Sequence, residues 1–263
     1  TLGGGTMAYN WNFSDGFSTT TNPAKHKYLN FGNYIVSVTL TSDSGCVDTL
    51  SRAVHVGKNN SLAFSATTVC EGNATSFVNT TDSTGSGGVN WLWSFGDNST
   101  NTAYSTTHTY TPGGTYNVLL TATTVDGCMD TLRKTAQVNY QPHPDFTFTD
   151  ACMGNANSFT NNTSVNGGNF SNSWTFGDGA TSTVLSPSHV YTSFGSFSVL
   201  LVTIADSGCV DSIRKTVNVF EVPMANYRAD SVCLGETTNF QNQTNTGTFV
   251  VQSWNWDLGD GTI

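Results

Sequence analysis

The stretch Trp174-Thr-Phe-Gly-Asp-Gly179 decides the fold, because closely related stretches recur along the chain. Two of them begin at Trp93 and Trp256, and a looser copy begins at Trp11. Successive tryptophans in this series are 82, 81 and 82 residues apart. A period of this length is too long for a solenoid unit and is typical of a small domain. The sequence therefore predicts tandem copies of one domain.

Other residue types keep the same spacing. The histidine, tyrosine and cysteine series that do so are His26, His108 and His189; Tyr28, Tyr110 and Tyr191; Tyr34, Tyr116 and Phe197; Cys46, Cys128 and Cys209; and Cys70, Cys152 and Cys233. We therefore expect two complete repeats, at 58–140 and 141–222. The C-terminal part of another repeat is predicted at 1–57, and the N-terminal half of a fourth at 223–263.

Hydrophobic residues alternate with polar ones, which indicates β-strands rather than helices. The residues expected to share a buried face are Tyr116, Val118, Leu120 and Ala122 in one strand, Trp91, Trp93 and Phe95 in a second, and Trp254, Trp256 and Leu258 in a third. Val125-Asp126-Gly127 has the Asp-Gly pair of a hairpin turn. Many short strands with such turns predict a β-sandwich. Half a sandwich leaves its sheet faces uncovered, so we expect both partial repeats to continue in a longer chain.

The composition excludes several classes of protein. Only 10% of the residues are charged, whereas 42 Thr, 28 Ser and 27 Asn supply small polar side chains. The net charge of −9 has the wrong sign for a protein that follows nucleic-acid phosphates. The sequence has no run of 18 apolar residues, so no membrane span is predicted. This composition favours an exported, extracellular or cell-surface β protein whose export signal lies outside the sequence.

Three motifs resemble those of PKD (polycystic kidney disease-like) domains. The tryptophan stretches resemble the family's W-x-F-G-D-G motif, and Pro187-Ser-His-Val-Tyr191 and Gly195-Ser-Phe-Ser-Val199 resemble its P-x-H-x-Y and G-x-Y-x-V elements. The resemblance covers essentially the whole chain. It implies an all-β chain of tandem immunoglobulin-like β-sandwich domains with a period of about 82 residues. The repeats depart from these motifs at three positions. The second repeat has Asn98 where the third has Gly179, the first has Ser14 where the third has Gly177, and the third has Phe197 where the family has a tyrosine.

The recurring residues are expected to be structural. The predicted structural residues are Trp11, Trp93, Trp174, Trp256, Asp97, Asp178, His108, His189 and Tyr116. A buried tryptophan still needs a partner for its N–H, and aspartate caps a tight turn. Tyr116 resembles a tyrosine corner. Because the Asp–His pair recurs in successive repeats, it belongs to the scaffold, and we predict no catalytic residues and no enzyme.

No cofactor is predicted, although Asp126 and Asp130 are weak candidates for calcium ligands. Turn capping is the favoured role for both. The pattern Asp-(Ser/Thr)-apolar resembles an O-glycosylation acceptor of exported bacterial proteins, and it recurs two residues after a cysteine. The predicted acceptors are Thr49, Thr131 and Ser212, with Ser83 and Ser231 as further matches. The alternative is that aspartate and threonine simply begin a strand after a hairpin.

The regular spacing of the cysteines predicts disulfides. In the topology that the resemblance implies, sequential pairing would span two domain lengths. Pairing of the first turn of one repeat with the last hairpin of the next selects Cys70–Cys209. Cys46 and Cys128 would then pair upstream of the sequence, and Cys152 and Cys233 downstream. The alternative is pairing within each domain, as Cys70–Cys128 and Cys152–Cys209. These disulfides would join opposite ends of a domain, but the sequence does not exclude them.

The resemblance implies a structural or adhesive segment of a large extracellular bacterial protein that forms a rod, stalk or filament. The expected partners are other copies or neighbouring repeats, and surface polysaccharide or a host cell surface. The weakly charged surface and the edge strands favour self-association. The alternative is a set of polymer-binding accessory domains in a secreted protease or glycosidase.

Overall fold

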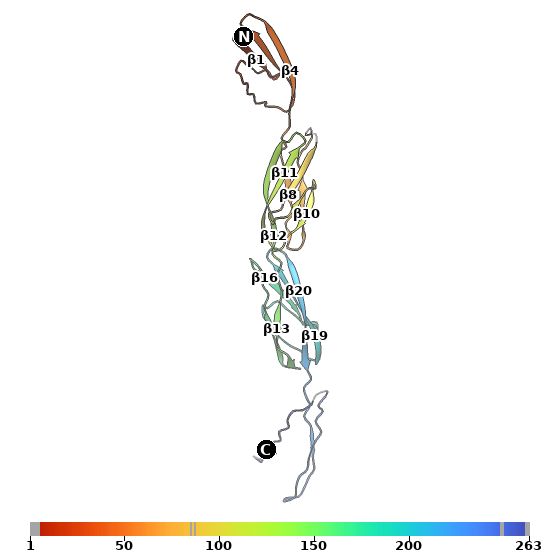
Figure 1. Cartoon of the computed structure of the whole chain (residues 1–263). Helices are drawn as coiled ribbons and strands as arrows, with labels where there is room; N and C mark the ends of the chain where they lie inside the picture. The colour runs from red at the N-terminus through yellow and green to blue at the C-terminus, as the bar shows by residue number, and fades with distance from the viewer. Residues whose placement is uncertain (1–5, 85, 87, 248–249, 261–263) are drawn as a thin grey trace. The chain divides into compact units, whose positions relative to one another are not determined.

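The computed structural model describes residues 6–84, 86, 88–247 and 250–260, and all the regular structure in them is β (Figure 1). The chain divides into two compact units, Thr1–Val138 and Asn139–Ile263, which are described separately below. The described part contains no helix long and apolar enough to cross a membrane. Gly261, the last residue of the fourth tryptophan motif, lies outside the described residues.

The second repeat is a sandwich of two sheets. One sheet has the order β10-β7-β5, with β5 at Phe64–Ala66, β7 at Ala74–Asn79 and β10 at Thr106–Thr109. The other has the order β6-β12-β11-β8-β9, with β6 at Val69–Cys70, β8 at Val89–Ser94, β9 at Thr100–Asn101, β11 at Gly114–Thr124 and β12 at Met129–Asn139. The strands β8, β11 and β12 pair antiparallel, as the predicted immunoglobulin-like sandwich requires.

The third repeat has the same two sheets. The first has the order β13-β15-β18, with β13 at Phe146–Phe148, β15 at Ala156–Asn161 and β18 at Ser188–Val190. The second has the order β14-β20-β19-β16-β17, with β14 at Ala151–Cys152, β16 at Phe170–Thr175, β17 at Thr181–Ser182, β19 at Gly195–Ala205 and β20 at Val210–Phe220. The short strand β14 joins the sheet parallel to β20.

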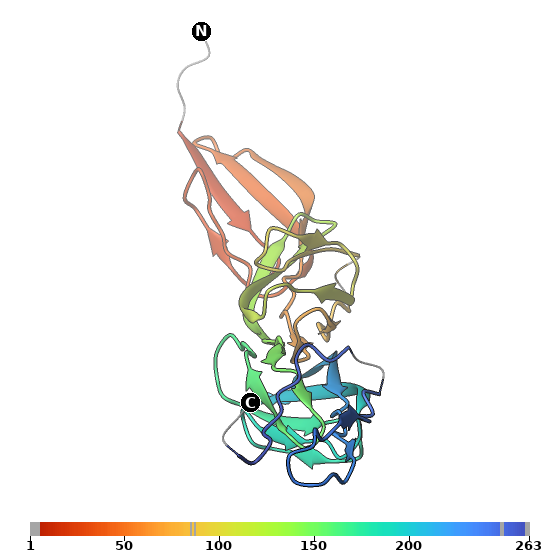
Figure 2. The ribbon, with the colours of Figure 1, turned by 90° about the horizontal axis from the view of Figure 1, so that it is seen from below.

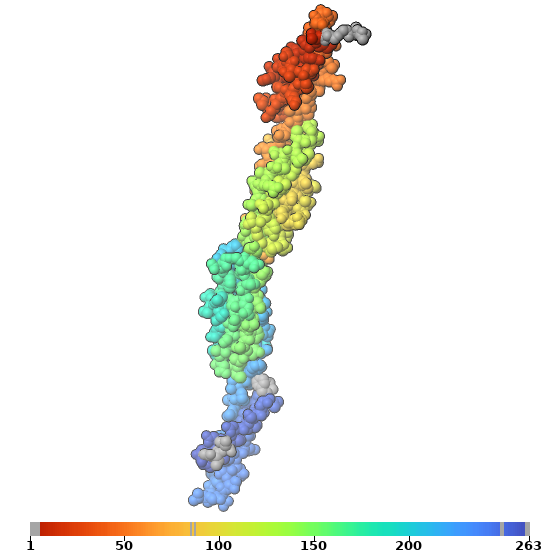
Figure 3. Space-filling model, turned by 60° about the vertical axis from the view of Figure 1, so that its left-hand side comes forward, coloured from red at the N-terminus to blue at the C-terminus, as the bar shows by residue number. Residues whose placement is uncertain are grey.

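The predicted alternation of buried and exposed residues is confirmed in the two complete repeats. In the second repeat Val118 and Leu120 of β11 are fully buried, and their neighbours on the strand are more exposed. They belong to a core around Trp93 that includes Phe64 and Phe77 from the opposite sheet. An equivalent core surrounds Trp174 in the third repeat. Figure 3 shows the outer face of the second repeat, whose atoms run from orange through yellow to green.

The hairpin between β11 and β12 also follows the prediction. Gly127 adopts a φ of 79°, which an L-residue rarely adopts. The turn is closed by a hydrogen bond from the Gly127 N–H to the Thr124 carbonyl, 3.0 Å, and another from the Thr124 N–H to the Cys128 carbonyl, 2.9 Å.

The first repeat contains one sheet, of order β2-β1-β3-β4 (Figure 2). Its strands are β1 at Met7–Asn12, β2 at Ser18–Thr19, β3 at Gly32–Ser42 and β4 at Val47–Val56. Described residues 6–60 contain no counterpart of the three-stranded sheet. Trp11 and Val38, which correspond to the fully buried Trp93 and Leu120, are therefore only half-buried.

The fourth repeat contains the hairpin of β21 at Tyr227–Ala229 and β22 at Phe240–Asn242. Trp256 contacts both strands, with ring centroids 5.6 Å from Tyr227 and 6.0 Å from Phe240. The strand predicted from the alternation at 254–258 is wrong for this structure. Its counterparts β8 and β16 pair with the long strands β11 and β19, and the described residues after 223 offer no such partner.

Candidate functional site

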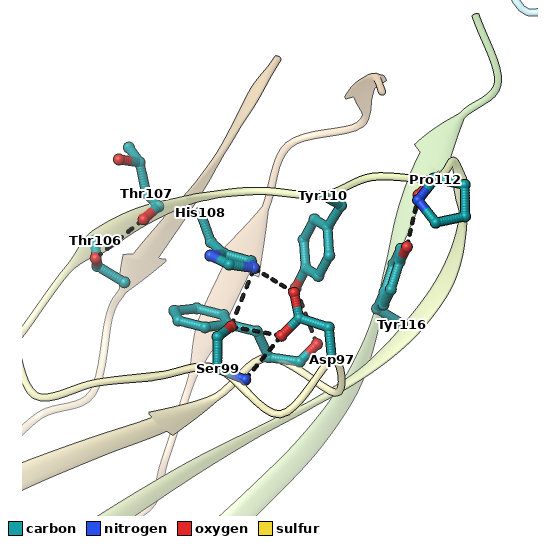
Figure 4. A network of polar contacts seen from close by, with 9 residues as sticks. Asp97, Ser99, Thr106, Thr107, His108, Tyr110, Pro112 and Tyr116 are labelled. Carbon is teal, nitrogen blue, oxygen red and sulfur yellow. Dashed lines mark hydrogen bonds and ion pairs between the residues drawn. The ribbon is translucent and has the colours of Figure 1, made fainter. Parts of the chain in front are cut away.

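A polar cluster follows β8 at the tryptophan motif of the second repeat (Figure 4). His108 Nε2, on β10, lies 2.6 Å from Asp97 Oδ2 and 3.1 Å from the Ser99 hydroxyl. The other carboxylate oxygen of Asp97 accepts hydrogen bonds from the Ser99 hydroxyl and from the Ser99 N–H, the latter at 3.0 Å. Both oxygens of the carboxylate therefore have partners within the repeat.

The His108 ring is held by aromatic contacts. It stacks on Phe95 with ring centroids 4.3 Å apart, and it lies edge-on to Tyr110 at 4.5 Å. Tyr110 is fully buried and donates its hydroxyl hydrogen bond to the Phe95 carbonyl, 3.1 Å away. These contacts link β10 to the turn after β8, so the cluster joins the two sheets.

The pKa values of Asp97 and Tyr110 are both shifted away from neutral pH. Burial alone would raise the pKa of Asp97, but hydrogen bonds from Ser99 and His108 outweigh it and lower this pKa to about 2. Burial, together with the negative charge of Asp97, raises the pKa of Tyr110 far above its ordinary value. A general acid or base works best when its pKa is near the working pH, and neither group meets this condition.

The same cluster recurs in the third repeat. His189 lies 2.7 Å from Asp178 and stacks on Phe176 at 4.3 Å, and Tyr191 donates to the Phe176 carbonyl at 3.0 Å. Burial would raise the pKa of Asp178, but hydrogen bonds from Ala180 and His189 lower it. Burial raises the pKa of Tyr191 to about 12.

The first repeat keeps the aspartate and histidine of this cluster. His26 lies 2.7 Å from Asp15 and stacks on Phe13 at 4.2 Å. Recurrence in three repeats supports a scaffold role for the cluster.

The motif glycine serves close packing against the neighbouring strand. A Cβ on Gly96 would lie 2.6 Å from the Asn117 carbonyl oxygen, and one on Gly177 would lie 2.9 Å from the Ser198 carbonyl oxygen. Both glycines also have a positive φ, of 86° and 89°. At the position of Gly96 the first repeat has Ser14, which adopts a φ of 65°.

The tryptophans of the two complete repeats and the tyrosine corner satisfy their polar groups locally, whereas the buried Trp11 Nε1 has no hydrogen-bond partner among the described residues. Trp93 and Trp174 are fully buried, and their indole N–H groups donate to the carbonyls of Ala103 at 2.9 Å and Val184 at 3.0 Å. The Tyr116 hydroxyl donates to the Pro112 carbonyl at 2.6 Å (Figure 4).

Phe197 replaces this tyrosine in the third repeat. It has no hydroxyl, but it keeps the ring contact by stacking on Tyr191 at 4.2 Å.

The sequence analysis missed a lysine that ties the sheets together. Lys134 Nζ of β12 donates to the Phe64 carbonyl at 2.6 Å and lies 5.2 Å from the centre of the Phe64 ring. Lys215 of β20 contacts the carbonyl and the ring of Phe146 in the same way, and its Nζ lies 2.7 Å from Asp145 Oδ1. The 81–82-residue register contains the signal, because Arg52, Lys134 and Lys215 occupy one position.

Two cysteines, Cys70 and Cys209, are disulfide-bonded. The free cysteines are Cys46, Cys128, Cys152 and Cys233. Because Cys128 and Cys152 are free, the structure does not contain the within-domain pairings.

The two calcium candidates are used separately. Asp126 Oδ2 lies 3.2 Å from His55 Nε2, and Asp130 Oδ1 accepts the Thr131 N–H at 2.8 Å. The described part of the chain holds no group of three or more His, Cys, Asp or Glu side chains that could bind a metal ion. The prediction of no cofactor, with Asp126 and Asp130 as weak calcium candidates, stays a prediction.

The three glycosylation triplets share one geometry. The carboxylates of Asp48, Asp130 and Asp211 each accept the N–H of the following hydroxyl residue, at 2.8, 2.8 and 2.7 Å. Those following residues, Thr49, Thr131 and Ser212, are exposed. Of the further matches, Ser83 is half-buried and Ser231 is exposed.

Comparison with known proteins identifies the family. The model of the PKD domain family matches residues 2–56, 61–140 and 139–220, and the chain therefore belongs to this family. No match was found among curated proteins.

Solved structures with similarity to the chain include two bacterial PKD domains. The PKD1 domain of Vibrio anguillarum Epp is 28% identical, with a TM-score of 0.30, and the match covers 32% of this chain and 99% of that one. The PKD1 domain of the Vibrio cholerae metalloprotease PrtV is 34% identical, with a TM-score of 0.28, and the match covers 30% of this chain and 98% of that one.

Proposed function

We propose that this chain is a structural segment of an extracellular bacterial protein, in which tandem PKD sandwiches form a rod, stalk or filament. The observation that carries the proposal is a contact between two consecutive repeats: the hairpin that contains Cys128, in the second repeat, packs against the end of the first repeat. Consecutive repeats that are fixed to one another make a stiff array, whereas repeats joined by a free linker do not.

Both sides of this contact lie in the first compact unit, Thr1–Val138. A Cβ on Gly57 would lie 2.7 Å from Cys128 Sγ and 2.9 Å from the Asp126 Cβ. The residue after β4 therefore has to be glycine for the hairpin of the second repeat to pack there. His55 contacts the same hairpin through Asp126, at 3.2 Å.

The third repeat shows where the first-turn cysteine of a repeat lies. In the parallel pair of β14 and β20, Cys152 is opposite Phe220. Phe220 occupies the position of Gly57, two repeats later in the same register. The first-turn cysteine of one repeat and the hairpin cysteine of the next are therefore both adjacent to this position. Applied to the second and third repeats, the relation supports a Cys70–Cys209 disulfide.

The polar clusters support a non-enzymatic role. They recur with the same internal hydrogen bonds, and the aspartate and tyrosine pKa values are shifted away from neutral pH. Export to an oxidising environment is consistent with disulfide-bonded cysteines. Binding of polysaccharide or of a cell surface stays a prediction.

Small-angle scattering of the oxidised protein and of the Cys70→Ser/Cys209→Ser variant tests the proposal. We expect a narrow distribution of long dimensions for the oxidised protein and a broader, shorter one for the variant. Cys46→Ser, which removes an exposed free thiol, is the matched control. Equal flexibility of the oxidised protein and the double variant would overturn the stiff array.

A further inference from the structure

The last strand of each of the first three repeats is an edge strand along most of its length. In the first repeat β4 ends the sheet and pairs with β3 alone. In the third, β14 covers β20 only at Val219 and Phe220. In the second, the two-residue strand β6 takes the same place beside β12. The remaining outer edges of β4, β12 and β20 have no strand beside them among the described residues.

The hairpin geometry fixes which residues point their backbone groups outward. The N–H of Ala205 donates to the Cys209 carbonyl, so Asp211, Ile213 and the alternate residues after them bond inward to β19. Two contacts confirm that the other residues face outward. The Gln141 side chain donates to the Val210 carbonyl at 2.6 Å, and the Asn218 N–H donates to Asp150 at 3.1 Å.

The residues between these two contacts, Ser212, Arg214 and Thr216, follow the same alternation. The Ser212 N–H is accepted by the carboxylate of Asp211, the preceding residue, at 2.7 Å. Among the described residues, no other strand pairs with the outward backbone groups of this stretch.

These edges carry a charge pattern that is complementary to itself. Each reads acid, outward residue, apolar residue, outward residue, base: the three copies are Asp48-Thr-Leu-Ser-Arg52, Asp130-Thr-Leu-Arg-Lys134 and Asp211-Ser-Ile-Arg-Lys215. When two such stretches run antiparallel, the acid at the start of one lies opposite the base at the end of the other. Five of the nine basic residues of the chain lie in these three stretches.

We propose that a second copy of this chain pairs antiparallel with this edge, on a two-fold axis at the central apolar residue. The inference rests on the proposed structural role and names the partner surface within it. At Leu132 the axis places Thr131 opposite Arg133 of the other copy, with the backbone groups of both residues directed outward. The Thr131 N–H, which the Asp130 carboxylate accepts in the single chain, exchanges that partner for the Arg133 carbonyl of the other copy. Asp130 then lies opposite Lys134 of the other copy, once on each side of the axis.

The side chains suit this register. Leu132 and Ile213 pack at the margin of their own cores and would meet their copies on the axis, where a non-hydrogen-bonded pair brings side chains closest. Lys134 already donates to the Phe64 carbonyl, but its ammonium group has three N–H donors. Charges on an edge strand usually block pairing. In the two-fold register the acid and the base at the ends of each stretch meet opposite charges, and Arg133 lies opposite the neutral Thr131.

Charge reversal tests the register. The Asp48→Lys/Asp130→Lys/Asp211→Lys variant places lysine opposite lysine or arginine, and the Arg52→Glu/Lys134→Glu/Lys215→Glu variant places glutamate opposite aspartate. In sedimentation equilibrium we expect each variant to self-associate at least about tenfold more weakly than the parent chain. An equimolar mixture of the two variants restores opposite charges at every pair, so we expect it to associate as the parent does.

The matched control is Asp43→Lys/Asp82→Lys/Glu236→Lys, which changes the net charge equally at exposed positions away from these edges. It should associate like the parent. A parent chain that stays monomeric, or an Asp→Lys variant that associates as strongly as the parent, overturns the edge pairing. The result for the Asp→Lys variant is decisive even if replacement of Lys134 disturbs folding, because that variant keeps Lys134. Loss of self-association does not change the small-angle scattering of a single chain whose repeats are linked by the disulfide. Failure of the edge pairing is therefore distinguishable from failure of the proposed stiff array.

Discussion

Replacement of Trp93 by alanine removes the centre of the second repeat's core. The ring is fully buried, with centroids 5.0 Å from Phe64 and 5.6 Å from Phe77, and its N–H bonds the Ala103 carbonyl at 2.9 Å. Tryptophan-to-alanine changes in cores cost about 3–5 kcal/mol, because transfer energy is lost and a cavity remains. A domain with a total stability of about 5–15 kcal/mol loses a large part of it.

The assay has to resolve one repeat in a chain of several, because the unfolding of linked domains is not a two-state process. Hydrogen exchange measured by mass spectrometry reports each repeat separately. We expect faster exchange in β8, β11 and β12 of Trp93→Ala and unchanged exchange in β16, β19 and β20.

Trp91→Ala is the matched control, since Trp91 lies on the same strand, is only partly buried and packs edge-on against Tyr104. We expect it to cost about 1–2 kcal/mol. The reasoning is refuted if Trp93→Ala loosens the second repeat no more than Trp91→Ala does.

Further predictions concern acid stability, catalysis, modification and calcium. Asp97 has a folded pKa of about 2 against an ordinary 3.8, so it contributes about 2 kcal/mol that is present above pH ~4 and lost as the pH falls towards 2; acid titration should show a smaller loss for Asp97→Asn. His108→Ala should abolish no turnover, and an activity lost with this change alone would contradict the scaffold role. Mass spectrometry of the native protein should find glycans on Thr49, Thr131 and Ser212. Recovery of these peptides only in unmodified form would contradict that prediction. Addition of calcium should leave the Tm unchanged, whereas a rise that saturates with calcium would establish a site.

Local patterns explain why much of the fold could be predicted. The alternation around Val118 and Leu120 marks a strand with one buried face, and Asp126-Gly127 marks the hairpin that follows it. The spacing of repeats then transfers the assignment from one domain to the next. The position of Trp93 in the core follows from the same reasoning.

Contacts between distant segments could not be predicted in this way. Lys134 reaches the carbonyl of Phe64, 70 residues earlier in the chain, because the sandwich brings the two sheets together. His55 meets Asp126 only where one repeat adjoins the next. The alternation around Trp256 predicted a strand that needs a partner strand to form, and sequence periodicity carries no information about that partner.

Non-reducing peptide mapping tests the central claim, a stiff array of PKD domains stapled at their junctions, most directly. Digestion of the oxidised protein with thiols blocked beforehand should yield one peptide pair that links Cys70 to Cys209 and disappears on reduction. The same digest of Cys70→Ser should contain neither the pair nor a substitute for it. Recovery of Cys70 linked to Cys128, or of Cys152 linked to Cys209, would contradict the account, because it would close each domain on itself and leave the junctions unlinked.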